Sequence, residues 1–151
     1  MRFLGFSAHS VEAAMAMLDR FTFDTIMFPV NYATWNAGNF GPQVLAKAQE
    51  KKMGILALKA LAKRPWPPGA DRSAHPNCWY EPMTDPDEAM LGLRFTLSHP
   101  VTTALMPSSG TCFELALKLA PKFTPLNQVE VAVMKRKGMA AVPLFRYREN
   151  G

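Results

Sequence analysis

The chain has 151 residues, of which 48% are hydrophobic and 19% charged, and its net charge is +5. This length and composition suit one packed domain spanning residues 1–151 and exclude a disordered chain. There is no membrane-length apolar run and no secretory leader after Met1, so we expect a soluble, cytoplasmic protein. The basic residues are scattered, which favours a solvated surface over a nucleic-acid interface.

Short apolar runs alternate with amphipathic segments along the chain. The apolar runs predict strands over 3–6, 25–28, 53–58 and 101–106. Helical spacing follows each run, with start signals at Ser10, Pro42 and Asp85, and with a turn over 107–111 before the fourth helix. At the third of these starts, Glu88 is predicted to complete a capping box with Asp85.

Two further segments are read from composition and spacing. The stretch 62–84 is rich in proline and aromatic residues and is predicted to be a long loop, of the kind that often covers a site. A last helix is predicted from about Pro125 to Gly138, followed by an irregular tail from Met139. The apolar stripe of this helix is predicted to be Val129, Val133 and Met134.

A strand followed by a helix, four times in succession, predicts parallel strands joined by right-handed crossovers. The fold class is therefore α/β. The periodicity alone fits an open doubly wound sheet and half of a (β/α)8 barrel equally well.

Polar side chains follow each predicted strand. Because the carboxyl ends of parallel strands share one face, these side chains are expected to form a site there, although any one of them could simply cap or turn the chain. Lys59 could bind phosphate, form an ion pair, form a Schiff base or reach solvent. His9 could act in acid–base chemistry or be structural. The residues at the strand ends are Ser7, His9, Asn31, Lys59, Ser108 and Ser109.

The segment Ser108–Thr111 opens a helix, and its free N–H groups predict either an anion site or an ordinary serine cap. In the long loop, His75, Cys78, Trp79 and Tyr80 have no spacing that suits a metal. With only Cys78 and Cys112 in the chain, we expect no disulfide framework and no metal site, and a reducing compartment.

Four stretches, in order, resemble the aldo/keto reductase family. They are 2–9, like the strand end G-x-S-N; 23–32, like D-x-x-Q-x-x-Y-N; 54–61, like (M/S)-(K/P)-P-L; and 93–103 with 106–109, like L-R-(Y/F)-x-L-S-x-P-V-T followed by I-P-G. The resemblance implies half of a (β/α)8 TIM barrel. The four parallel βα units correspond to strands five to eight, with a C-terminal helix added.

The family's chemistry is hydride transfer between NADP or NAD and a carbonyl compound. By resemblance, Ser7 would hydrogen-bond the nicotinamide, and the loop 108–111 would grip the adenosine phosphate. Ala8, Met27 and Leu58 replace the usual asparagine, glutamine and stacking aromatic residue. The expected cofactor contacts are Ser7, His9, Asn31, Leu58, Lys59, Pro107, Ser108, Ser109, Gly110 and Thr111.

The family's catalytic Asp, Tyr, Lys and His belong to the first four strands, so the resemblance assigns no catalytic residue here. We expect a partial oxidoreductase that is inactive alone and is either truncated from a longer chain or closed by homodimerisation, because half a barrel leaves sheet edges unpaired. The expected partners are a nicotinamide dinucleotide and, once the barrel is complete, a small carbonyl substrate. The alternatives are a Schiff-base or phosphate-handling lyase that uses Lys59, and a non-catalytic assembly module.

Overall fold

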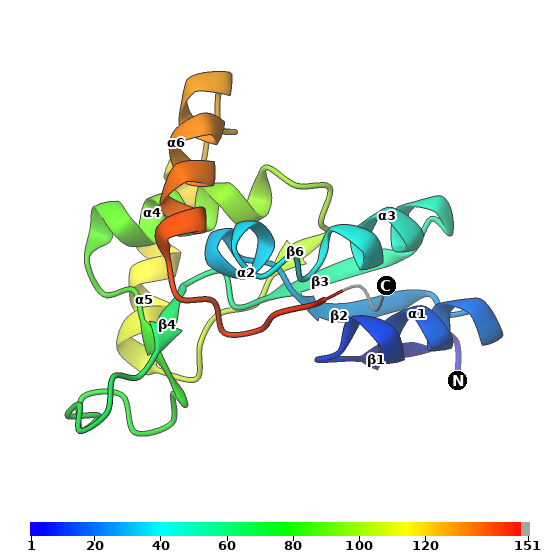
Figure 1. Cartoon of the computed structure of the whole chain (residues 1–151), viewed down its shortest axis with the longest axis horizontal. Helices are drawn as coiled ribbons and strands as arrows, with labels where there is room; N and C mark the ends of the chain where they lie inside the picture. Colours follow the sequence, from blue (N-terminus) through cyan, green and yellow to red (C-terminus); the bar gives the residue numbers. More distant parts are fainter. Residues whose placement is uncertain (149–151) are drawn as a thin grey trace.

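A four-stranded parallel sheet runs through the centre of the computed structural model, which describes residues 1–148 (Figure 1). Its strand order is β1-β2-β3-β6, and each neighbouring pair is parallel. The strands are β1 (Gly5–Ser7), β2 (Thr25–Pro29), β3 (Gly54–Leu58) and β6 (Thr103–Ala104). The α/β class and the four parallel βα units are confirmed.

Four of the helices begin after a residue whose side chain accepts a hydrogen bond from the free N–H groups of the first turn. Ser10 accepts a hydrogen bond from the Ala13 N–H, and Asp85 accepts from the N–H of Glu88. The capping box predicted for Glu88 is wrong, because its carboxylate binds Lys63 at 2.8 Å instead. The helices are α1 (Val11–Arg20), α2 (Tyr32–Asn36), α3 (Pro42–Glu50), α4 (Pro86–Leu97), α5 (Gly110–Leu119), the 3-10 turn η1 (Ala120–Lys122) and α6 (Gln128–Ala140).

The two faces of the sheet differ. Ile26 and Phe28 of β2, and Ile55 of β3, are buried against helices α1 and α3 on the outer face. Met27 and Leu56 alternate with them, lie on the inner face and are only partly buried. The outer face is therefore the core of the fold, and the inner face is partly open, as expected for the concave side of a half barrel.

The predicted long loop contains a second sheet. Strands β4 (Ala62–Pro65) and β5 (Tyr80–Pro82) pair antiparallel, and Arg64 binds Glu81 at 2.6 Å across them. The prediction that 62–84 lacks strands is thus wrong at both ends of the segment. Prolines and short length conceal such strands in the sequence.

The C-terminal helix also differs from its prediction. It begins at Gln128 rather than near Pro125, because Asn127 and Glu130 form a capping box. It ends at Ala140, two residues beyond the predicted end. Val129 is 73% exposed, so the predicted apolar stripe is wrong there. Met134 is buried as predicted, together with Gly138, and Val133 is partly buried.

Gly138 lets α6 approach α2 closely. A Cβ at this position would meet the Tyr32 carbonyl and lie 2.6 Å from the Asn36 Nδ2. We therefore expect Gly138→Ala to destabilise the protein by about 1–3 kcal/mol through overpacking. Gly110→Ala is the control, because a Cβ there meets nothing within 4 Å. Urea unfolding measures both variants, and equal stabilities would contradict the close approach.

Candidate functional site

The parallel register brings the carboxyl ends of β1, β2 and β3 to one edge of the sheet. A chain of side chains then connects these ends. The His9 ring lies 5.5 Å from the Phe145 ring, and Phe145 lies 5.9 Å from Trp79. The Lys59 Nζ lies 4.9 Å from the Trp79 ring centroid. The structure thus brings together His9, after β1, and Lys59, after β3.

The Lys59 side chain packs against two aromatic rings, those of Trp79 and Tyr80. Its Nζ also lies 4.8 Å from the Tyr80 ring centroid, so two π faces contact the ammonium group. Its backbone has φ +70°, which turns the chain directly after β3. Burial lowers the Lys59 pKa, and the neighbouring Cys78 acts in the opposite direction. Lys59 is therefore a half-buried cation at the sheet edge.

His9 lies close enough to Lys59 to feel its charge. Its pKa is lowered first by burial and second by the positive charge of Lys59. The neutral imidazole is therefore favoured at neutral pH. Phe145, which contacts His9, comes from the tail that the sequence analysis left irregular, and it stacks on Phe40 with centroids 5.0 Å apart.

Asn31 is 1% exposed and is engaged at both ends of its amide. Its Oδ1 accepts from the Thr34 N–H at 2.8 Å and caps α2, while its Nδ2 donates to the Lys59 carbonyl at 3.3 Å. Asn31 therefore fixes the turn that carries Lys59. A direct cofactor contact by Asn31 stays a prediction.

The inner face of the sheet carries a hollow of about 260 Å³ that is lined in part by Ser7, Met27 and Leu56. Ser7 is exposed at the end of β1 and pairs in register with Met27. Leu58 is partly buried at the end of β3, where its carbonyl accepts from the Val30 N–H at 2.9 Å. Ser7 is thus the polar group at this part of the edge.

The second part of the site is the corner before α5. Pro107 and Ser109 form its turn, since the Ser109 N–H donates to the Pro107 carbonyl at 2.8 Å. The Ser109 hydroxyl does not cap the helix and lies 3.0 Å from both the His75 Nδ1 and the Thr111 Oγ1. The first helical hydrogen bond runs from the Phe113 N–H to the Ser109 carbonyl, so the N–H groups of 110–112 lack helical partners.

A hollow of about 240 Å³ lies in front of this corner, lined by 74–77 and 108–111. Next to Gly110 there is open space for an approaching group. Free N–H donors, the hydroxyl-bearing residues Ser108, Ser109 and Thr111, and the positive end of a helix dipole together suit an anionic group such as a phosphate.

The loop 66–79 connects the two parts of the site. His75 contacts Ser109 at one end of it, and Trp79 contacts Lys59 at the other. The loop lies within the segment 62–84, whose length led us to predict a loop of the kind that often covers a site. The contacts of His75 and Trp79 are tertiary, and no local pattern in the sequence indicates them.

Within residues 1–148, no group of three or more His, Cys, Asp or Glu side chains is arranged to hold a metal ion. In the same residues, no helix combines the length and hydropathy needed to span a bilayer. The two cysteines are free and buried.

Comparison with known proteins gives a match at the level of fold. No protein-family model matches the chain, and no curated protein gives a significant match. Among solved structures, the aldo-keto reductase AKR11C1 from Bacillus halodurans matches in its holo and apo forms, each with a TM-score of 0.63 and 20% sequence identity. Each match covers 98% of this chain, and 52% and 53% of the holo and apo chains respectively.

The chain therefore spans about half the length of the solved structures it matches. The prediction of half a barrel with the aldo-keto reductase fold is confirmed. At 20% identity the likeness concerns the fold, and the roles of single residues stay predictions.

The proximity of His9 and Lys59 is testable through proton binding. We expect Lys59→Met to raise the His9 pKa, because removing the cation stops it from opposing protonation of the imidazole. NMR titration of the imidazole C–H signals measures this pKa. Lys63→Met is the matched control, since Lys63 is paired with Glu88. A His9 pKa that is the same in all three proteins would show that the two strand ends do not converge.

Proposed function

We propose that this chain is the cofactor-binding half of an aldo-keto reductase barrel, within an oxidoreductase that uses NADP or NAD to reduce small carbonyl compounds. The observation that carries the proposal is the half-barrel match to a reductase solved in a holo form, together with the hollow of about 240 Å³ at the corner before α5. We further propose that the protein acts in the cytoplasm, in keeping with its two free cysteines.

The residues present fit the phosphate end of a nicotinamide dinucleotide well. Ser109, Gly110 and Thr111 line one hollow, which places the helix-start N–H groups of 110 and 111 and two side-chain hydroxyls beside it. The dinucleotide, when bound, supplies the hydride. The chain's own contribution is to hold the anionic groups and to orient the ring along the strand ends.

The nicotinamide end fits less tightly. Ser7 offers a hydroxyl group, whereas the Asn31 amide is already bonded to the Thr34 N–H and the Lys59 carbonyl. Met27 supplies a thioether where an amide would bond the carboxamide group. We therefore propose that contacts with the phosphates contribute most of the affinity, with the Lys59 ammonium as a further cation near the strand ends.

Closing the barrel requires further βα units. In the described part of the chain, β1 and β6 each pair on one side only. Next to these edges, exposed apolar side chains include Phe3 and Phe21 near β1, and Phe113 and Leu117 on α5. We propose that a second copy of the chain or the rest of a longer chain covers them and that the isolated half has no reductase activity. If the chain were instead a non-catalytic assembly module, the same two sheet edges, β1 and β6, would form its contacts with other chains.

The proposed phosphate site at 108–111 can be tested by calorimetric titration with NADPH and NADH. We expect saturable binding that Gly110→Asp weakens at least about tenfold, because a carboxylate would occupy the N-terminal end of α5 and repel the phosphate. Gly110→Asn is the matched control, because it has the size of aspartate without the charge, and it should bind more tightly than the aspartate variant. The proposal fails if neither nucleotide binds up to millimolar concentration, or if the aspartate variant binds equally well.

A second function is favoured by the environment of Lys59. Burial lowers its pKa, which increases the fraction of free amine at a given pH, and its side chain lies at an accessible sheet edge. In this function the amine adds to a carbonyl carbon and the carbonyl oxygen leaves as water, which gives a C=N bond. The aromatic faces of Trp79 and Tyr80 oppose it, because they stabilise the ammonium form.

Borohydride trapping distinguishes the two functions. If Lys59 forms Schiff bases, incubation with glyoxylate and borohydride should modify Lys59 in preference to Lys63, and Lys59→Arg should abolish that modification. Peptide mass spectrometry locates the adduct. Equal modification of Lys59 and the surface lysines would rule this second function out and leave the nucleotide titration unaffected.

A further inference from the structure

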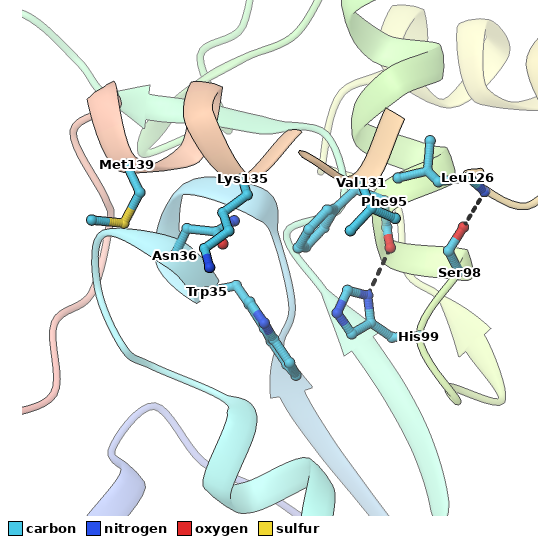
Figure 2. A pocket seen from close by; sticks show the side chains of 9 residues that line it. All are labelled: Trp35, Asn36, Phe95, Ser98, His99, Leu126, Val131, Lys135 and Met139. Atoms are coloured by element: carbon cyan, nitrogen blue, oxygen red, sulfur yellow. Dashed lines mark hydrogen bonds between the residues drawn. The ribbon is translucent and has the colours of Figure 1, made fainter. Parts of the chain in front are cut away.

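A cavity of about 450 Å³ lies among helices α2, α4 and α6, away from the strand ends (Figure 2). Residues on all three helices or directly after them line it, including Trp35 from α2, Phe95 from α4 and Lys135 from α6. Its volume lies within the range of small-molecule sites. None of the residues in the sequence-predicted cofactor site contributes to its lining.

The walls of this cavity are held apart by contacts at both ends of α6. At one end, Arg94 binds Glu130 through two bonds of 2.7 Å and also donates to the Thr124 carbonyl at 2.7 Å. At the other end, Gly138 packs on Tyr32 and Asn36. Because α6 is fixed at both ends, its central side chains extend over a defined gap.

The floor of the cavity is aromatic. Trp35 and His99 meet edge to face with centroids 4.3 Å apart, and Phe95 lies 4.6 Å from the His99 ring. Such a surface favours a flat, apolar ring as its ligand. The Phe95 side chain is itself buried.

His99 is a polar residue of this floor, and one hydrogen bond determines which of its ring nitrogens carries the hydrogen. The His99 Nδ1 lies 2.8 Å from the Phe95 carbonyl oxygen, which can only accept, so Nδ1 carries the hydrogen. Burial lowers the His99 pKa and favours the neutral ring. The Nε2 atom is then an acceptor, and Figure 2 shows it turned to the side on which Trp35 lies.

The opposite wall supplies a cation. Lys135 extends from α6 toward Trp35 and Asn36 (Figure 2). Within residues 1–148 it belongs to no ion pair. A ligand that spans the cavity thus meets an acceptor at His99, a ring surface at Trp35 and a positive charge at Lys135.

We propose that this cavity binds a small phenolic carboxylate: the ring lies on Trp35 and Phe95, the phenol O–H donates to the His99 Nε2, and the carboxylate pairs with the Lys135 ammonium. Each end of the ligand is recognised by a different group, so losing either end should weaken binding. The site is separate from the proposed nucleotide site and does not need a completed barrel.

The test uses the whole chain with Trp66→Phe and Trp79→Phe, which leaves Trp35 as the reporter of fluorescence. We expect para-hydroxyphenylacetate to change this fluorescence saturably. Phenylacetate, which lacks the donor, and para-hydroxyphenylacetamide, which lacks the charge, should each bind at least about threefold more weakly. Lys135→Met should weaken the first ligand at least about fivefold, and Lys137→Met, an exposed neighbour on α6, should not change it.

If the double tryptophan variant does not fold, the Trp35 indole N–H and the His99 ring nitrogens are followed by ¹⁵N NMR in the unchanged chain. Equal affinity for the three ligands would overturn the proposal, because it would indicate only an apolar hollow. Equal affinity in the Lys135→Met and Lys137→Met variants would also overturn it, as would the absence of any saturable change.

Discussion

The buried amide of Asn31 is the contact on which the arrangement of the strand ends depends. It caps α2 with one atom and holds the Lys59 carbonyl with the other, so that one side chain ties the ends of β2 and β3 together. Next to it, the buried Thr96 hydroxyl donates to the Val30 carbonyl at 2.8 Å and adds α4 to the same junction. A buried polar group left without its partner costs about 1–3 kcal/mol, so these bonds strongly favour one geometry of the edge.

This junction explains why Lys59 is half buried rather than free in solvent. The Asn31 bond fixes the left-handed turn at Lys59, and the turn directs the side chain to Trp79 and Tyr80 from the segment after β4. Trp79 in turn reaches Phe145 and so His9. Local backbone conformation and a long loop thus produce an edge with one cation and one neutral imidazole, an environment that attracts anionic groups.

The sequence predicted the four βα units because each feature is local. Apolar strands, caps such as Asp85 and helical spacing are readable over a few residues. The β4–β5 pair was missed because its strands are short and contain prolines, and its pairing joins Ala62 with Pro82 across the loop. The sequence also did not reveal that Asn31 bonds the Lys59 carbonyl or that Phe145 contacts His9, because a residue type does not show its tertiary partner. It was predictable that the polar residues after the strands lie at one edge of the sheet, because the carboxyl ends of parallel strands share one edge.

The two faces of the sheet differ in how fully other parts of the chain cover them. On the outer side, helices cover the β2 and β3 side chains, and the contacts of Arg94 and Gly138 hold α6 in place. On the inner side, Ser7 and Met27 line an open hollow, and β1 and β6 lack outer neighbours among residues 1–148. A ligand on the inner side therefore meets only part of its surroundings, whereas the lining of the helical cavity comes from helices that already pack on one another. Because binding strength depends on burial as well as on polar contacts, nucleotide affinity should depend on what closes the barrel, and affinity at the helical cavity should not.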